Sequence, residues 1–297
     1  MTAATIARFR AMGTDIALIG PEAAEARAAA SATHAVRSTF EREEMRFSRF
    51  RATSELTAVN QTAGRTTKVS RPFAALVRRA LGAAERTGGL FDPTVLPALV
   101  AAGYDRGFDE VLAGARGALH PTSPCGRWRA VHLVGRRVHI PAGVALDLGG
   151  IAKGWTADLA AEAAVGAGLP WALVNAGGDL RIAGDAPEVE VSIEDPGAPD
   201  MECARLRLSS GAVATSSVVA RAWGEGFHHL IDPRTGRPAG GDVIQATVWA
   251  PSCVEAEVLA KAVLLGGPTA AADVPTAIVT TAGDLVLCMP MTEESAA

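Results

Sequence analysis

The sequence predicts an α+β fold in which mixed, mainly antiparallel sheets pack against helices. Apolar segments of strand and helix character follow one another without the regular alternation of a doubly wound sheet. Two pairs of expected strands are joined by short turns, around Gly135-Arg136 and Ala282-Gly283-Asp284. With 297 residues, of which 48% are hydrophobic and 20% charged, the chain is long enough for one large core or two tightly joined lobes.

The first third of the chain predicts one strand and two helices. The strand is expected over residues 9–20. A long Ala-rich helix is expected over 21–46, because its apolar positions recur at helical spacing. A second helix is expected over 72–87, where Gly88-Gly89 supply the usual C-terminal end.

The rest of the chain predicts a hairpin, two more helices and several strands. The hairpin covers 131–140, and a strand over 144–148 leads into a glycine turn. The expected helices span 153–168 and 254–265. The remaining expected strands cover residues 171–175, 188–194, 242–250, 277–281 and 285–289.

We expect a single domain over residues 1–290, with two intimately packed lobes as the alternative, and a flexible tail over 291–297. The sequence shows no internal repeat and no linker long enough to separate domains. Flexible points are expected at the Pro-rich segments near 121–124 and 196–200.

Charge, cysteine spacing and missing motifs exclude several classes of protein. The net charge of −4 leaves no basic excess to follow a nucleic-acid backbone. The four cysteines lie far apart without C-x-x-C spacing, so neither a zinc knot nor a redox pair is indicated. The motifs of the common nucleotide hydrolases, dehydrogenases, zinc proteases and lipases are missing. No stretch approaches the ~18–20 apolar residues of a membrane span, and no leader or lipid-anchoring cysteine is visible, so a cytoplasmic location is expected.

The segment from Asp147 to Gly154, with the sequence DLGGIAKG, is the clearest candidate for a ligand site. Its adjacent glycines let a ligand approach the backbone without a Cβ in the way. Amides at the start of the following helix, with Lys153 nearby, favour anionic oxygens. A phosphorylated ligand is therefore expected here, with a plain tight turn as the alternative.

Glu257 and Lys261 lie four residues apart on one face of the helix expected over 254–265, so both can point into the same site. Magnesium prefers oxygen ligands, usually one or two carboxylates together with substrate phosphates and water. An ordinary salt bridge on a solvated helix face is the structural alternative for this pair.

Beside the DLGGIAKG segment, six further motifs occur in the order typical of one family. They are Met12-Gly13-Thr14, Ser54-Glu55-Leu56 with Asn60, GLFDPTV at 89–95, NAGGD at 175–179, HLIDPRTG at 229–236 and EAEVLAK at 255–261. The chain resembles the FAD:protein FMN transferases of the ApbE family over residues 12–266.

The resemblance implies an enzyme that binds FAD and Mg²⁺, transfers the FMN half to a serine or threonine hydroxyl of an acceptor flavoprotein, and releases AMP. In the family, an aspartate and, four residues on, a threonine hold the magnesium with a backbone carbonyl of the glycine turn. The matching residues here are Glu257, Lys261 and Gly150. An ammonium has no lone pair for a cation, so Lys261 either binds a diphosphate oxygen directly or pairs with Glu257.

The resemblance also implies the residues that contact the flavin nucleotide. Phe50 falls where the family usually has a tyrosine and offers an aromatic face for stacking, with plain core packing as the alternative. Asp92 and Asp179 have a second interpretation as turn formers. The full predicted set is Met12, Phe50, Leu90, Phe91, Asp92, Asp147, Lys153, Asp179, Thr215, His229 and Ile231.

His229 is the candidate general base, because an imidazole accepts a proton near neutral pH and because it opens the HLIDPRTG motif; a nearby carboxylate is the alternative. Glu257 and Lys261 complete the predicted catalytic set. The neighbouring His228 is expected to be exposed on the other side of a strand.

Two other activities stay open at this point. One is Mg²⁺-dependent hydrolysis of FAD to FMN and AMP, which uses the same site. The other is FAD binding without catalysis, which the lysine at position 261 permits. The family's acceptor motif resembles D-x-x-[ST]-G-A-[ST]; residues 209–213 match it only in part and end in valine, so self-modification is not predicted.

Overall fold

A computed structural model describes residues 3–113, 125–224 and 226–290, which fall into two compact units. Unit 1 comprises residues 1–40, 153–217 and 241–297, and unit 2 comprises residues 41–152 and 218–240. The single domain over 1–290 stays a prediction. The Pro-rich segment near 121–124 and the tail over 291–297 lie outside the described residues.

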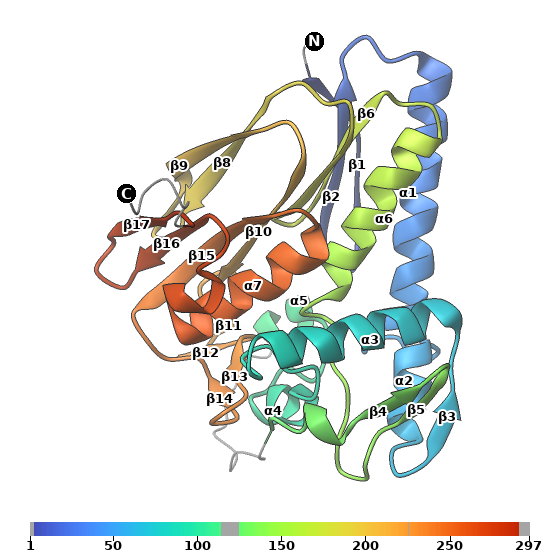
Figure 1. Cartoon of the computed structure of the whole chain (residues 1–297), viewed down its shortest axis with the longest axis vertical. Helices are drawn as coiled ribbons and strands as arrows, with labels where there is room; N and C mark the ends of the chain where they lie inside the picture. The colour runs from blue at the N-terminus through green and yellow to red at the C-terminus, as the bar shows by residue number, and fades with distance from the viewer. Residues whose placement is uncertain (1–2, 114–124, 225, 291–297) are drawn as a thin grey trace, which may run out of the picture. The chain divides into compact units, whose positions relative to one another are not determined.

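Unit 1 is built on an eight-stranded sheet in the order β1-β2-β6-β7-β10-β15-β16-β17 (Figure 1). Every neighbouring pair is antiparallel, as the sequence predicts for most of the fold. The strands are β1 Ala3–Ala11, β2 Thr14–Pro21, β6 Trp171–Ala176, β7 Asp179–Gly184, β10 Gly211–Ser217, β15 Val243–Ala250, β16 Thr276–Thr280 and β17 Leu285–Cys288.

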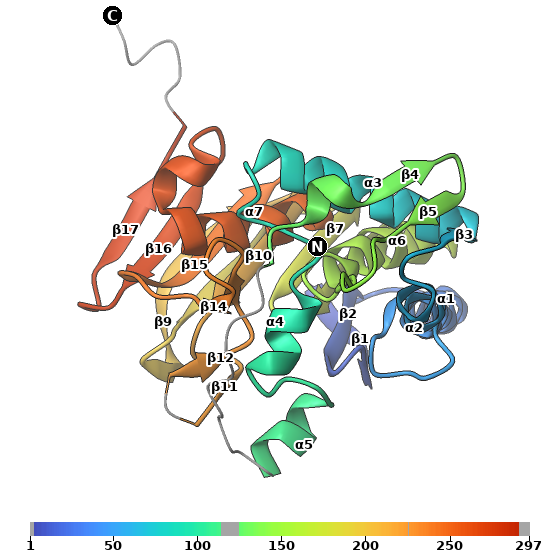
Figure 2. The same ribbon diagram turned by 90° about the horizontal axis from the view of Figure 1, so that it is seen from below.

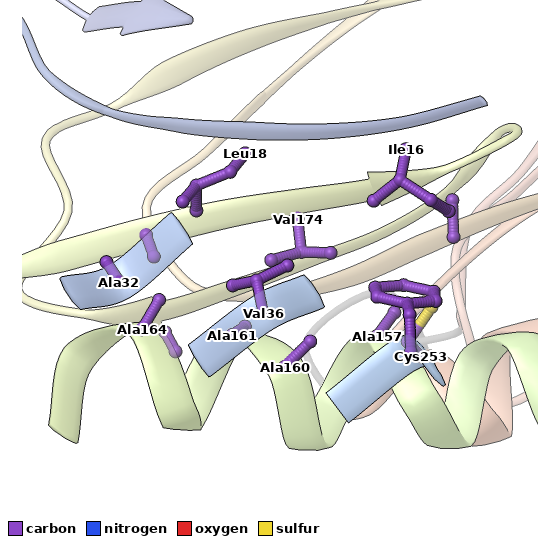
Figure 3. Close-up of a cluster of buried hydrophobic side chains, with 14 of the residues drawn as sticks. Ile16, Leu18, Ala32, Val36, Ala157, Ala160, Ala161, Ala164, Val174 and Cys253 are labelled. Carbon is purple, nitrogen blue, oxygen red and sulfur yellow. The ribbon is translucent and has the colours of Figure 1, made fainter. Parts of the chain in front are cut away.

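Two alanine-rich helices cover one face of this sheet. They are α1 (Ala26–Phe47), whose last seven residues belong to unit 2, and α6 (Ala152–Gly166). Figure 3 shows Ala157 and Ala161 of α6 in the same buried cluster as Val36 of α1 and Val174 of β6. Alanine leaves room for close approach between the helices and the strands, and its helix propensity is high.

The opposite face of the sheet is covered by the hairpin of β8 (Val189–Asp195) and β9 (Ala198–Leu208). Successive residues of β6 contribute to different cores, because side chains alternate across a strand. Trp171 packs with buried side chains of the β8–β9 hairpin, whereas Ala172 packs with those of α1 and α6. This arrangement explains why 171–175 is an almost continuous apolar run in the sequence.

The third helix of unit 1, α7 (Cys253–Gly266), packs along β10 and β15 and is followed by the short helix η2 (Pro268–Ala271) (Figure 2). The N-terminus of α7 is capped by a side chain of α6. Asp158 accepts hydrogen bonds from the backbone amides of Cys253 at 2.8 Å and Val254 at 3.0 Å. The two helices are therefore fixed in register with each other.

Unit 2 consists of one long helix, α3 (Arg71–Arg86), several short helices and small sheets. Ser54 and Ser70 accept backbone hydrogen bonds at the starts of α2 and α3, and Glu55 accepts two more from Ser70. The helices are α2 Glu55–Gln61, α3 Arg71–Arg86, α4 Leu96–Ala101, α5 Phe108–Ala113 and η1 Trp128–Ala130. The strands are β3 Thr66–Lys68, β4 His132–Val134, β5 Arg137–His139, β11 Ala222–Trp223, β12 Phe227–His228, β13 Ile231–Asp232 and β14 Arg237–Pro238.

All four predicted helices and most predicted strands are confirmed. The single strand expected over 9–20 is wrong, because Met12 and Gly13 adopt positive φ angles of 51° and 70° and turn the chain into the β1–β2 hairpin. The strand expected over 144–148 is also wrong: this segment is irregular, and the Asp147 amide donates to the Pro93 carbonyl at 2.8 Å. The α2, β7, β9 and β10 elements are absent from the prediction.

No helix within the described parts of the chain is long and apolar enough to cross a membrane. The cytoplasmic location stays a prediction.

Candidate functional site

Four charged side chains of unit 1 meet between α6, β7 and α7, and we call them the ionic cluster. Lys153 donates to the Asp179 carboxylate and, at 3.0 Å, to Oε1 of Glu257. Lys261 donates to the same Oε1 at 3.2 Å. The structure thus brings together four of the residues that the sequence analysis singles out.

The close crossing of α6 and α7 places Glu257 in this cluster. A Cβ at Gly154 would lie 2.5 Å from the Cys253 carbonyl oxygen, so only glycine allows the two helices to approach this closely. The Gly154 amide then donates to Oε2 of Glu257 at 2.9 Å. Gly154, the last glycine of the DLGGIAKG motif, therefore allows the close packing of the two helices, and its amide directly binds the buried carboxylate.

Asp179 is positioned by the turn between β6 and β7. Gly177 has a φ of 66°, and a Cβ there would lie 2.0 Å from the Thr14 hydroxyl oxygen. The Gly178 amide donates to the side chain of Asn175 at 2.9 Å. The motifs MGT and NAGGD thus contact each other, and their glycines allow Asp179 to begin β7 at the ionic cluster.

Burial and ion pairing act in opposite directions on the two carboxyl groups. Burial alone would raise the pKa of Glu257, but the ammonium groups of Lys153 and Lys261 outweigh it and lower that pKa to about 2. Burial raises the pKa of Asp179, the charge of Glu257 adds to this, and Lys153 opposes it. Lys153 and Lys261 therefore favour the ionised form of Glu257.

The donor set of the ionic cluster does not fit a divalent cation. Both oxygens of Glu257 already accept hydrogen bonds, and two of their three donors are ammonium groups. At an effective dielectric constant near 20, two like unit charges about 4 Å apart repel by about 4 kcal/mol. Among the residues that the structure describes, no group of three or more His, Cys, Asp or Glu could hold a metal ion. Gly150, the third predicted metal ligand, belongs to unit 2, so its relation to Glu257 stays a prediction.

A second candidate region lies in unit 2 around Arg49, which the sequence analysis did not single out. Its guanidinium lies 4.1 Å from the ring centre of Phe50 and 4.4 Å from that of Tyr104. It also pairs with Asp147 at 3.3 Å and donates to the Tyr104 carbonyl at 2.7 Å. We call Arg49, Phe50, Tyr104 and Asp147 the arginine–aromatic cluster. Phe50 is 46% exposed, so its ring is accessible for stacking rather than buried in a core.

The segment Leu90–Asp92 is shaped by hydrogen bonds within its own turn. Asp92 accepts from the backbone amide of Thr94 at 2.7 Å and from its hydroxyl at 2.6 Å. The Phe91 amide donates to the Thr87 hydroxyl, and the Phe91 ring is buried, whereas Leu90 is half-buried. Burial raises the pKa of Asp92, and the hydrogen bonds from Thr94 oppose the shift. The interpretation of Asp92 as a turn former is confirmed.

The two adjacent histidines of unit 2 differ from each other. The prediction that His228 is exposed is wrong: it is buried, its Nε2 lies 3.0 Å from the Ala239 carbonyl oxygen, and its Nδ1 accepts from the Leu230 amide. Burial lowers the pKa of His228. His229 is half-buried, and its backbone amide donates to the Arg221 carbonyl. Its role as a general base stays a prediction.

The remaining predicted residues lie outside both clusters. Ile231 is buried among aromatic side chains of unit 2, next to Asp232, whose carboxylate pairs with Arg234 at 2.8 Å. Met12 lies in the β1–β2 turn of unit 1, and Thr215 on β10 shares a hydrogen bond of 2.9 Å with Thr247. Their contacts with a nucleotide stay predictions.

Besides Arg49, the sequence analysis missed the structural roles of Gly154 and Asp158. A signal for the ionic cluster was present, however, in the rarity of lysine. Lys68, Lys153 and Lys261 are the three lysines of the chain, which has 28 Lys and Arg residues together. Two of these three meet at Glu257.

Comparison with known proteins supports the resemblance found in the sequence. The model of a family described as the ApbE family matches residues 12–279. The FAD:protein FMN transferase of Treponema pallidum is 34% identical over 251 residues, which cover 76% of this chain and 69% of that protein. The protein of the same name from Rhodobacter capsulatus is 31% identical over 234 residues, 73% of this chain and 43% of that protein.

The same similarity is visible in three dimensions. The crystal structure of the ApbE protein from Thermotoga maritima matches with a TM-score of 0.83 at 26% identity, covering 97% of each chain. The predicted α+β fold is thereby confirmed, together with the family resemblance.

Proposed function

The chain belongs to the ApbE family, and on this premise we propose that it transfers the FMN moiety of FAD to a serine or threonine hydroxyl of an acceptor flavoprotein, releasing AMP. The observation that carries this proposal is the ionic cluster, in which two ammonium groups lie over buried carboxylates. Such a pair suits the diphosphate of FAD, because ammonium groups offer compact positive charge to phosphate oxygens.

The proposed reaction is one displacement at phosphorus. The acceptor hydroxyl oxygen forms a bond to the FMN-side phosphorus, while the anhydride bond from that phosphorus to the bridging oxygen breaks. The bridging oxygen leaves with AMP and its electron pair, and the hydroxyl proton passes to a base. The products are an FMN phosphoester on the acceptor, AMP and one proton.

Each candidate residue has a proposed part in this step. Lys153 and Lys261 offset the charge on the diphosphate, and Glu257 holds both ammonium groups in place. His229 accepts the proton of the acceptor hydroxyl. Phe50 offers an exposed ring for stacking with a ring of the nucleotide, and Arg49 holds that ring in place.

The magnesium requirement implied by the family resemblance stays a prediction. In unit 1, its predicted protein ligands are a glutamate already held by two ammonium groups and a lysine that has no lone pair to offer. The chemistry proposed above is therefore assigned to the side chains alone.

Mass spectrometry tests the proposal directly. The full chain is mixed with FAD and a substrate protein that carries a D-x-x-[ST]-G-A-[ST]-like motif, with AMP followed in parallel. We expect the substrate to gain the mass of an FMN phosphoester with one AMP released per modification. The matched control replaces the acceptor Ser or Thr of the substrate with alanine and removes the modification.

The same experiment separates the two alternatives. AMP formation with an unmodified substrate would replace the transferase proposal with FAD hydrolysis. Intact FAD bound to the protein, with neither product, would replace it with a flavin-binding protein.

A further inference from the structure

Resting on the proposed function, we propose that this chain holds the diphosphate of its nucleotide with the ammonium groups of Lys153 and Lys261, and that no divalent cation binds at Glu257. Lys261 then supplies, as part of the protein, the positive charge that a metal ion would otherwise bring. Three features of the ionic cluster support this inference.

The first feature is that the carboxylates of the ionic cluster are more deeply buried than its ammonium groups. The side chains of Asp179 and Glu257 are 2% and 0% exposed, whereas those of Lys153 and Lys261 are 18% and 14% exposed. The carboxylates are therefore enclosed and the ammonium groups face what little solvent reaches the cluster. An anion that approaches the cluster meets positive charge first, and a cation meets repulsion first.

The second feature is that both carboxylate oxygens of Glu257 already accept hydrogen bonds. Oε1 of Glu257 accepts from both ammonium groups, and Oε2 accepts from the Gly154 amide. A magnesium ion needs oxygen ligands at about 2.0–2.1 Å in near-octahedral geometry. It would have to displace at least one ammonium group from Glu257, and Lys261 would remain close to the ion because it also donates to the Glu257 carbonyl oxygen at 3.3 Å.

The third feature is the use of lysine rather than arginine in the ionic cluster. The protein carries its cationic residues almost entirely as arginine, with Lys68 as the one lysine outside the cluster. An ammonium is a compact point charge with three donors, so it can bind a buried carboxylate and a phosphate oxygen at the same time.

Direct measurement of cation binding tests the inference without relying on activity. Electron paramagnetic resonance follows free Mn²⁺ during titration of the full wild-type chain, with and without FAD. We expect that wild type and Glu257→Gln bind the same amount of Mn²⁺, because Glu257 is not a ligand of the ion. One Mn²⁺ per chain that is bound by the wild type and lost in Glu257→Gln would overturn the proposal.

Substitutions at Lys261 test the same point from the other side. Lys261→Thr removes the ammonium and supplies a hydroxyl with lone pairs, so this variant is expected to gain Mn²⁺ binding. Lys261→Met removes the charge alone and is expected to weaken FAD binding in EDTA about 10-fold or more, as loss of a charged hydrogen bond would do. Lys68→Met, the matched change at an exposed lysine, should leave FAD binding unchanged. Equal FAD affinity of Lys261→Met and wild type would contradict the proposal.

Activity measurements then separate this inference from the function on which it rests. FMN transfer that continues in EDTA supports both. Transfer that stops in EDTA and returns with Mg²⁺ would overturn the metal-free site and leave the transferase intact. Absence of transfer under both conditions would remove the proposed function, and the FAD and Mn²⁺ titrations would still decide whether the lysine pair binds the diphosphate.

Discussion

The ionic cluster of unit 1 and the arginine–aromatic cluster of unit 2 both hold a cation against a buried carboxylate, but they do so with different side chains. In unit 1, two flexible ammonium groups share one glutamate, and the surrounding groups are charged. In unit 2, one planar guanidinium pairs with Asp147 and lies near the rings of Phe50 and Tyr104.

This difference indicates which part of a nucleotide each cluster suits. Ammonium groups without aromatic neighbours favour phosphate oxygens, whereas an exposed ring held by a guanidinium favours stacking on a flat base. Four predictions test the comparison, beginning with the largest expected effect.

Replacing Glu257 with alanine should have the largest effect, because it removes the group that holds both ammonium ions. The change leaves two cations and the Gly154 amide without this acceptor, so the free energy of unfolding should fall by about 3–5 kcal/mol. Urea denaturation measures the change. Glu255→Ala, two residues earlier on α7 and only half-buried, should cost less than about 1 kcal/mol. Similar losses for both variants would mean that the ionic cluster contributes little to stability.

Replacing Arg49 with lysine should have an intermediate effect, although the charge is kept. A lysine cannot reproduce both the pairing with Asp147 and the planar stacking beside Phe50. The free energy of unfolding, measured by urea denaturation, should therefore fall by about 2 kcal/mol. Arg51→Lys, at a more exposed arginine, serves as the control and should stay within about 0.5 kcal/mol of wild type. If Arg49→Lys leaves the free energy of unfolding unchanged, positive charge alone is enough to stabilise the arginine–aromatic cluster, as it is in the ionic cluster of unit 1.

Two glycine-to-alanine changes within α6 should affect stability differently. In Gly154→Ala the new Cβ would lie 2.5 Å from the Cys253 carbonyl oxygen, and the expected loss is about 1–3 kcal/mol. In Gly166→Ala no atom lies within 4 Å of the new Cβ, so stability should stay the same or rise by up to about 1 kcal/mol. Denaturant midpoints of the two variants give the comparison. Equal midpoints would contradict the close packing of α6 against α7.

The two units should also respond to acid in different pH ranges, and the stage that belongs to His228 is the smallest of the expected effects. The folded pKa of His228 is lowered from 6.5, so its contribution to stability is present above pH 6.5 and is lost as the pH falls through the lowered value. The pKa of Glu257 is lowered from 4.5 to about 2, so its contribution is lost between these values, and Asp179, whose pKa is raised, partly opposes it. Unfolding free energies measured from pH 7 to pH 2 should decline in two stages. His228→Gln should remove the first stage; a variant that keeps it would assign that stage to another group.

Periodicity and motif order predict much of unit 1 and less of unit 2. The helices over 26–47 and 253–266 have long periodic sequences, so their type and position follow from the sequence. Apart from α3, which the sequence predicts, the elements of unit 2 are short, and their positions depend on caps such as Ser54 and on tertiary hydrogen bonds such as that from Asp147 to Pro93. Short elements of this kind carry little periodic signal.

The candidate site shows the same limit. The pairing of Glu257 with Lys261 follows from their spacing of four residues on one helix. The contribution of Lys153 and Asp179 depends on which helices and strands meet, and Gly154 reveals its role only through the distance to Cys253. Arg49 was missed because nothing in its local sequence marks an arginine that stacks on residues far along the chain.

The discontinuous course of the chain through unit 1 has a consequence for protein synthesis. Strand β2 pairs with β1, which directly precedes it in the chain, but its other neighbour is β6, in which Ala176 pairs with Ile16. Ribosomes add about 5–20 residues per second, so the open edge of β2 waits roughly 8–32 s for its partner strand. During that interval Ile16 and Leu18, which are fully covered in the finished protein, have only the hairpin and α1 to shield them. Newly made chains should therefore depend on chaperones most strongly before residue 176 leaves the ribosome, and truncation before β6 should give an aggregating product.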